Sequence, residues 1–312
     1  MKEERLEEIR EQAQSAAAFA ERSADVAGGL MPRRVGYYGQ AVVRPPVWTW
    51  EIPVYFFIGG AGGMAAVISL GATLIHNVDL ARTSILISVV AAILSPILLI
   101  LDLGRPARFL NMLRVFKPQS AMSVGAWLLV FFSSIVAAAF IALELQLPAV
   151  AATPLLVGAA LLGSLLATYT GVLLGVTTVP AWFTHHRLLP VHFGTAGLGS
   201  AAAMLELLGH RIAPLNALGL VAAGAETILA VSLFFNRHGA SDRALHVGPS
   251  GRLLRAAEIL SGPAALILRV SGLIPLAAIC FLLGALLSRF GWLAAGKISG
   301  RDPEAVFATQ RA

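Results

Sequence analysis

Residues 84–103 read SILISVVAAILSPILLILDL, a run whose single charged side chain is Asp102. At about 1.5 Å of rise per residue, roughly 20 helical residues cross the ~30 Å hydrocarbon core of a bilayer. The run lacks the strict alternation of apolar and polar side chains that is typical of a membrane barrel strand. Because lipid offers no hydrogen bonds to the backbone, this stretch predicts a membrane-spanning α-helix.

Comparable apolar runs recur along the chain and predict an all-α membrane protein, a polytopic bundle of about eight spanning helices. The seventh run has only a short apolar core, so it is also typical of a helix lying at the membrane interface. The charged residues that bracket this core are Arg252, Arg255, Glu258 and Arg269. That alternative gives seven spans and places the two termini on opposite sides. The eight runs cover residues 51–76, 84–103, 121–143, 153–177, 190–209, 213–236, 253–270 and 271–291.

The composition agrees with a membrane protein. Hydrophobic residues make up 57% of the 312 residues and charged residues 13%, with a mean hydropathy of +0.78, whereas a soluble domain carries about 25% charged residues. Cys280 is the single cysteine, which excludes an internal disulfide and an iron–sulfur cluster held by this chain alone. The net charge of +6 is explained by arginines and lysines that flank a membrane, and we expect no binding to nucleic acid.

The sequence divides into three parts. Residues 1–50 predict a surface helix, over 3–27, followed by a loop. Residues 51–291 form the predicted transmembrane bundle, and residues 292–312 form a C-terminal tail. The first part is densely charged where a secretory signal would place an apolar core, so we do not expect a signal peptide.

The basic residues are divided unevenly between the two sides of the predicted bundle. Most arginines lie on the side of the N-terminus, whereas the other side has little beyond Arg82 and Arg211. The positive-inside rule therefore places the N-terminus in the cytoplasm, and an even number of spans places the C-terminus there too. An arginine-rich face can also dock an acidic partner, and this alternative stays open.

Ionisable side chains inside spanning helices are costly and therefore favour a functional interpretation. Glu226 falls near the middle of the sixth span, where a carboxyl group can relay protons. Glu206 and Glu144 lie progressively closer to the far side, so the three residues predict a proton relay, although Glu144 is also explained as an interfacial residue. Asp102 closes the second span near Arg105, either as a structural clamp on a tight turn or as a group that handles protons.

Polar side chains on the side of the N-terminus are candidates for binding a ligand. Tyr169, in the fourth span, can donate a hydrogen bond to a carbonyl ligand, with Gly171 leaving room beside it. A hydrogen bond to a neighbouring backbone carbonyl explains this tyrosine equally well. Glu51 and Tyr55 open the first span at the same face. Residues 59–63 (GGAGG) follow no strand, so they predict close helix packing and not a dinucleotide loop.

The seven histidines all fall at predicted helix ends or in loops. A membrane b-type haem generally needs axial ligands inside the bundle, so we predict no haem. His185, His186 and His192 can contribute to a site at the cytoplasmic surface. Their spacing is a weak indication of metal binding, and we predict no metal site.

Residues 102–112 read DLGRPARFLNM, and residues 120–127 read SAMSVGAW. Both stretches resemble the NrfD/PsrC family, the membrane subunits of polysulfide reductase-like, nitrite reductase-like and related respiratory complexes. The likeness covers about residues 50–303 in order. It extends to GGAG at 59–62, YTG at 169–171, PAW at 180–182 and AGKISGRDP at 295–303.

The resemblance implies a haem-free subunit of the bacterial inner membrane that binds a quinone or quinol, either menaquinone or ubiquinone. It implies electron exchange with an iron–sulfur subunit, which is attached to a molybdopterin-type or similar catalytic subunit. Tyr169 matches the family tyrosine associated with the quinone site, and Asp102 and Arg105 match the signature block. Where family members use polar side chains early in the first helix, this chain offers Glu51 and Tyr55.

We therefore expect quinone to bind between the first four spans near the N-terminal face, and we assign no catalytic residue to the isolated chain. Two other functions stay open. A secondary transporter would use Glu226 and Asp102 as substrate or proton sites. A structural anchor would hold a redox enzyme at the membrane without binding quinone.

Overall fold

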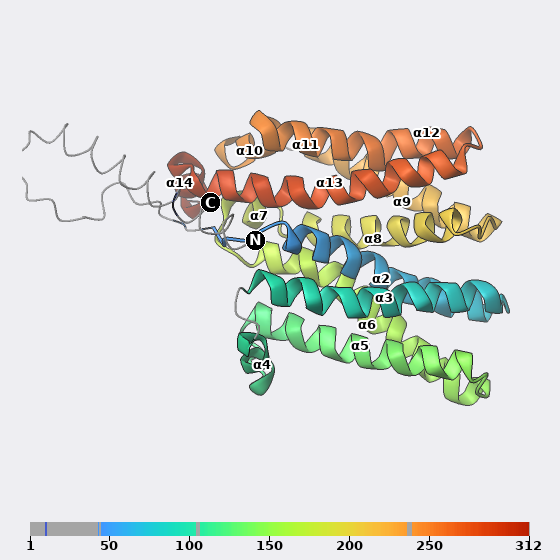
Figure 1. Cartoon of the computed structure of the whole chain (residues 1–312). Coiled ribbons are helices and arrows are strands. Elements are labelled where there is room, and N and C mark those ends of the chain that lie inside the picture. The colour runs from blue at the N-terminus through green and yellow to red at the C-terminus, as the bar shows by residue number, and fades with distance from the viewer. Residues whose placement is uncertain (1–9, 11–42, 44, 104–106, 236–238, 312) are drawn as a thin grey trace, which may run out of the picture.

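The structure is a computed structural model and describes residues 10, 43, 45–103, 107–235 and 239–311. Within these residues every regular element is helical, and the long helices run side by side (Figure 1). Seven of them are long and apolar enough to cross a membrane. They are α2 (Glu51–Leu74), α3 (Val78–Asp102), α5 (Ala121–Glu144), α6 (Ala149–Gly175), α8 (Leu188–Leu207), α9 (Ala213–Phe235) and α13 (Ile274–Arg301).

An eighth, broken helix lies alongside α13 (Figure 1). It consists of α11 (Gly248–Ile259), a π-helical turn η2 (Leu260–Ala264) and α12 (Ala265–Val270). The break follows from two adjacent residues: Pro263 has no N–H to donate, and Gly262 has non-helical angles of φ −95° and ψ −106°. Counted with the seven uninterrupted helices, this element confirms the prediction of about eight spans.

Shorter helices connect the long ones at one end of the bundle, which we call the site end (left in Figure 1). The residue stretch 45–49, which enters α2, and the last helix of the chain both lie there. The predicted surface helix over 3–27 falls, apart from Arg10, outside the described residues. The short helices are α4 (Ala107–Arg114), α7 (Pro180–Thr184), η1 (Gly239–Asp242), α10 (Arg243–His246) and α14 (Pro303–Arg311).

The opposite end, the turn end, joins helices α2–α3, α5–α6, α8–α9 and α12–α13 by short hairpins. Each hairpin has one residue with positive φ, namely His76 (57°), Gln146 (49°), Gly209 (103°) and Gly272 (78°). In each, the following N–H bonds the carbonyl five residues back, which is the Schellman motif that satisfies the last carbonyls of a helix. These bonds are Asn77–Ala72, Leu147–Ala142, His210–Leu205 and Leu273–Leu268, of 2.9, 2.9, 3.1 and 2.9 Å.

The bundle is built from two groups of four helices. Helices α2, α3, α5 and α6 form the N-terminal half, and α8, α9, α11–α12 and α13 form the C-terminal half. Helix α8 packs against α2 and α6, and α13 packs against α2, so these contacts join the halves. Buried aromatic rings occupy the junction: Trp48 stacks on Trp182 with 5.7 Å between ring centroids, and Trp182 Nε1 donates to the Trp292 carbonyl at 2.7 Å.

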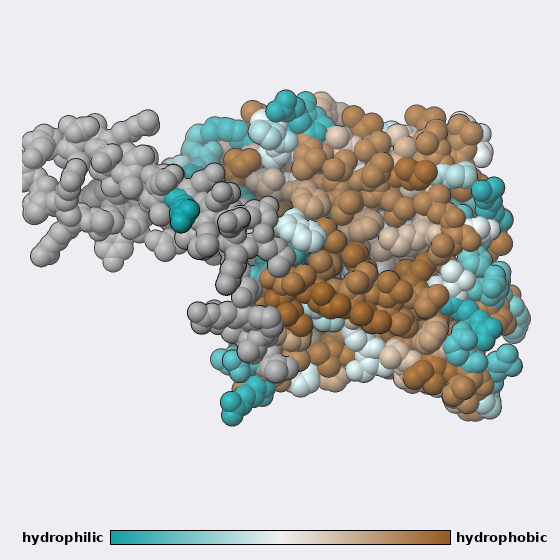
Figure 2. All heavy atoms as spheres, in the orientation of Figure 1, coloured by the Kyte–Doolittle hydropathy of each residue, from teal (hydrophilic) through white to brown (hydrophobic). Residues whose placement is uncertain are grey.

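Small residues allow the closest helix contacts, as the sequence predicts. Gly63 of α2 and Gly163 of α6 face each other, and a Cβ on either would overlap the backbone carbonyl of the other. Side chains on the outside of the bundle are apolar. Figure 2 shows them as a broad hydrophobic band between two more hydrophilic ends, the surface that a membrane protein presents to lipid.

Helix α13 extends past the predicted end of the last span at residue 291 and continues to Arg301. Trp292, Ala295 and Gly296 are buried on its inner face, so packing against the bundle keeps this part helical. The first residues of the predicted tail therefore belong to the bundle.

Candidate functional site

A buried cluster at the site end joins the start of α2 to the end of α3. The Thr49 hydroxyl is within hydrogen-bond distance of Glu51 Oε2 and, at 3.2 Å, of Asp102 Oδ1, so its one hydrogen is shared between the two carboxyl groups, while the Thr49 N–H donates to the same Asp102 oxygen at 3.3 Å. Glu51 is 1% exposed and Asp102 9%. One threonine thus holds two carboxyl groups that lie 51 residues apart in the chain.

The positions of the two carboxyl groups differ electrostatically. Glu51 lies in the first turn of α2, where the helix dipole favours a negative charge. Asp102 is the last residue of α3, where the dipole disfavours one. A carboxyl group with this unfavourable placement requires compensation from elsewhere, and Thr49 supplies two hydrogen bonds. The predicted ion pair with Arg105 stays a prediction, because Arg105 falls outside the described residues.

Tyr55 lies one turn after Glu51 and is buried. Beside it lies the buried hydroxyl of Ser95, for which the described residues offer no hydrogen-bond partner. A Cβ built on Gly59 would lie 3.5 Å from both the Ser95 oxygen and the Tyr55 ring. Glycine at this position therefore keeps space between two polar side chains inside the N-terminal half.

Tyr169 is half-buried, and its hydroxyl donates a hydrogen bond to the Ala121 carbonyl at the start of α5. This is the backbone contact that the sequence left as an equal alternative. The room for the phenol comes from Gly125, where a Cβ would overlap the ring. Gly171 has another role than the predicted one, because its Cα faces the backbone of Leu189 in α8.

Four of the five predicted quinone-site residues therefore lie at the site end of the N-terminal half. Glu51 and Asp102 share a donor, Tyr55 lies one turn further along α2, and Tyr169 bonds to the Ala121 carbonyl. Arg105 is the fifth.

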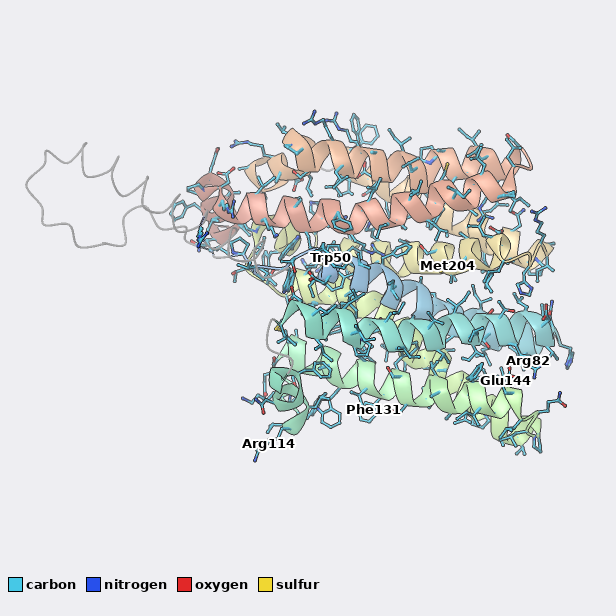
Figure 3. The ribbon with its side chains drawn as sticks, viewed as in Figure 1. Trp50, Arg82, Arg114, Phe131, Glu144 and Met204 are labelled. Carbon is cyan, nitrogen blue, oxygen red and sulfur yellow. The ribbon has the colours of Figure 1, made fainter. Side chains whose placement is uncertain are left out.

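The three predicted relay carboxylates lie in separate environments. Both Glu206 oxygens accept from Arg269 of α12, at 2.6 and 2.7 Å, and Arg269 also donates to Asn216 at 3.1 Å. Glu144 forms an exposed ion pair of 3.2 Å with Arg82 near the turn end (Figure 3). The structure thus gives Glu206 and Glu144 a cation each, and brings neither next to Glu226.

Glu226 instead pairs with a histidine. His192 Nδ1 lies 2.8 Å from Glu226 Oε2, and the Thr195 hydroxyl donates to Oε1. His192 falls at the start of the predicted fifth span, and in the structure it is buried in the second turn of α8. The sequence feature that could have indicated this site is the spacing of His192 from Thr195, since side chains three residues apart lie on one helix face. Sequence reasoning also missed Arg289, buried on α13.

The family model described as "Polysulphide reductase, NrfD" matches residues 40–217, which is more than half of the chain. The chain therefore belongs to the NrfD family of multi-pass membrane proteins, as the sequence motifs predict. Membership indicates a membrane subunit of a respiratory oxidoreductase complex, and members usually assemble with iron–sulfur and catalytic subunits. No curated protein matches the chain.

Proposed function

We propose that this chain is the membrane subunit that exchanges electrons between a quinone/quinol pool and an iron–sulfur subunit, which in turn serves a catalytic subunit. The observation that supports the proposal best is the buried pair of carboxyl groups, Glu51 and Asp102, on the shared donor Thr49. Such groups are costly inside a membrane protein and are most simply explained by a need for protons at this place.

The residues around the pair fit a quinone. Its carbonyl oxygens accept hydrogen bonds, and the Ser95 hydroxyl is buried with no partner among the described residues. Its ring is flat and apolar, and Phe56 lies next to Tyr55 with 5.5 Å between ring centroids. A bound quinone would supply two-electron, two-proton carbonyl chemistry, which the protein chain itself lacks. Glu51 and Asp102 would hold the protons, and Tyr55 and Ser95 would orient the ring.

The location at the site end suits a partner protein. The short helices and longer connections gather there, whereas the turn end has only tight hairpins (Figure 1). An iron–sulfur subunit docked on the site end would bring its nearest cluster close to the carboxyl pair. Basic side chains at this end, among them Arg114 and Lys117, are available to an acidic partner.

The test is purification of the tagged chain in mild detergent, with mass spectrometry of accompanying proteins and lipids and an assay of quinol turnover. We expect an iron–sulfur protein and bound quinone. Glu51→Gln and Asp102→Asn should each lower turnover at least tenfold while the complex still assembles, because each removes a proton-carrying group. Asp79→Asn is the matched control, since this carboxylate is 89% exposed near the turn end. Full turnover in both site variants would overturn the proposal.

One observation favours a second function, a secondary transporter. Helices interrupted inside the membrane are typical of transporter binding sites, and the break at Gly262 and Pro263 lies in the half that contains Glu226. Proton-dependent uptake by the isolated chain in vesicles would support this function. Co-purification with an iron–sulfur protein would count against it.

A further inference from the structure

The His192–Glu226 pair has a defined protonation pattern. Both Glu226 oxygens accept hydrogen bonds, one from the Thr195 hydroxyl and one from His192 Nδ1. When Glu226 is a carboxylate, the hydrogen between the two side chains lies on Nδ1, and in the neutral imidazole Nε2 is then a bare acceptor. His192 is 7% exposed, and among the described residues its Nε2 has no hydrogen-bond partner. The pair thus presents a buried, unoccupied proton acceptor.

Charged groups from two further helices face this pair. Arg289 of α13, 1% exposed, interacts electrostatically with Glu226. Glu258 is a half-buried acidic residue of α11, and Arg255 lies one turn before it on the same helix. Arg255 is exposed, so water screens it. Arg269 of α12 is held by its ion pair on another carboxylate. The buried Arg289 guanidinium therefore balances the charge of one carboxylate, that of Glu226. The second carboxyl group, that of Glu258, still needs a proton or a cation.

The break in the eighth helix lies beside the same groups. Glu258 is in the last turn of α11, directly before the π-helical turn. Gly262 packs on Thr227, the neighbour of Glu226, so closely that a Cβ would lie 3.0 Å from the Thr227 hydroxyl. Such single π-helical turns occur frequently at functional sites. The break therefore lies beside the turn of α9 that carries Glu226, and the half-buried Glu258 lies one turn before it on α11.

A second histidine–carboxylate pair lies at the site end, next to α7 and η1. His185 Nε2 is 3.0 Å from Asp242 Oδ1, and both residues are buried. The His185 and His192 rings pack on the same indole, that of Trp292, with centroid distances of 5.7 and 6.3 Å. Titratable groups therefore continue from α7 and η1 towards His192.

An aromatic layer separates the cluster from the proposed quinone site. Phe56 of α2 lies 6.0 Å, centroid to centroid, from Phe193 of α8, and the Arg289 guanidinium lies 3.7 Å from the Phe193 ring centroid. Phe56 also contacts Tyr55 on its other side. The two polar regions are therefore distinct sites, one in each half of the bundle.

We propose that His192, Glu226 and Glu258 form a proton-binding site in the C-terminal half, through which quinone chemistry in the N-terminal half is coupled to proton movement. In this exchange the Glu258 carboxyl group gives up one proton and Nε2 of His192 takes up one. This leaves a Glu258 carboxylate and an imidazolium paired with Glu226. The reverse transfer restores the starting state. The proposal rests on the proposed function for its driving force, but Glu226, Glu258 and Arg289 lie beyond the residues that the family model matches.

The first test uses the complete complex, purified through this chain and sealed in vesicles with a pH-sensitive dye inside. Quinol turnover and the protons moved per electron are measured in the same sample. We expect Glu226→Gln and Glu258→Gln to keep turnover within about twofold while the protons moved per electron fall by at least half. The exposed Asp79→Asn should change neither quantity. An unchanged proton ratio in both variants would overturn the coupling.

A second test needs no quinone activity. Nitrogen NMR of the full chain with labelled histidines reports the tautomer and charge of each ring, and His192→Gln identifies the His192 signals by their loss. We expect the neutral ring of His192 to carry its hydrogen on Nδ1 and to gain a second proton as the pH falls. Glu258→Gln should shift the midpoint of this change by about one pH unit. A hydrogen on Nε2, or a ring that never titrates, would exclude the site.

The two tests separate the two proposals. Wild-type complex without quinol turnover would contradict the proposed function and leave the NMR result to decide the proton site. Normal turnover with an unchanged proton ratio would contradict the proton site alone.

Discussion

Single residues with two hydrogen-bonding functions hold the site end together. Thr49 lies just before α2, and through its hydroxyl and its N–H it contacts a carboxyl group on each of two helices. Hydrogen bonds to charged groups contribute about 1.5–3 kcal/mol, and a buried acceptor left without its donor costs a similar amount. A small side chain outside the helices therefore fixes the geometry of Glu51 and Asp102.

The first prediction concerns this threonine. Thr49→Val keeps the shape of the side chain but removes the hydroxyl, so we expect a loss of about 1–3 kcal/mol in stability and a marked fall in quinol turnover. Thr49→Ser retains the hydroxyl and should restore most of both. Thermal unfolding in detergent and the turnover assay measure the two effects. Equal behaviour of the two variants would show that the hydroxyl is unimportant.

The second prediction concerns the buried ion pair of Glu206 and Arg269, whose side chains are 2% and 0% exposed. Removing one partner leaves an uncompensated charge, so Glu206→Gln alone should cost about 3–5 kcal/mol. The double variant Glu206→Gln with Arg269→Met leaves no charge and should recover much of that loss. Unfolding of the two single variants and the double variant gives the coupling energy. A double variant as unstable as the sum of the singles would contradict the expectation.

At the scale of elements, the two ends of the helices are built differently. Every hairpin at the turn end uses the same Schellman motif, and two of the four positive-φ positions hold side chains instead of glycine. A residue with a Cβ pays about 1–2 kcal/mol for a left-handed conformation. The sequence of these turns is therefore not optimal for stability.

The third prediction follows from these turns. Gln146→Gly should stabilise the protein by about 0.5–1 kcal/mol, because glycine adopts positive φ without the steric penalty. Gly209→Ala should destabilise it by a similar amount, since nothing near Gly209 would contact the new methyl group and the backbone angle alone decides the sign. Thermal unfolding of both variants in one detergent checks the opposite signs. Shifts of the unfolding temperature with the same sign in both variants would show that the positive-φ conformation does not control the stability of these turns.

At the scale of the whole molecule, the unequal charge of the two ends predicts orientation. Exposed arginines and lysines gather at the site end, whereas the turn end has the half-buried Arg82 and the exposed Arg211 among the described residues. The positive-inside rule therefore predicts a cytoplasmic site end.

The fourth prediction tests this orientation by labelling. After Cys280→Ala removes the single cysteine, Gln310→Cys marks the site end and Gln146→Cys the turn end, both at exposed positions. A membrane-impermeant maleimide added to intact cells should label Gln146→Cys and leave Gln310→Cys unlabelled until the cells are opened. The reverse pattern would place the partner on the outer side of the membrane.

The spanning helices could be predicted because runs of about 20 apolar residues have few alternatives in any fold. Which face of each helix packs inside the bundle could not be predicted, because a helix in lipid is apolar on both its inner and outer sides. The pairing of Glu206 with Arg269, or of Glu226 with His192, depends on how the helices are rotated. Of the candidate site, Glu51 and Asp102 were predictable from their places at helix ends, whereas the role of Thr49 was not.

The hairpins at the turn end also bear on how the protein is made. Each joins two apolar helices through a turn of a few residues, and the four turns together carry little charge, with Arg211 the clearest exception. Moving such a turn across the bilayer during insertion costs far less than moving a charged loop. With the predicted orientation, the chain can therefore enter the membrane as four helix pairs, one after another, while the long, charged connections stay on the side of the ribosome.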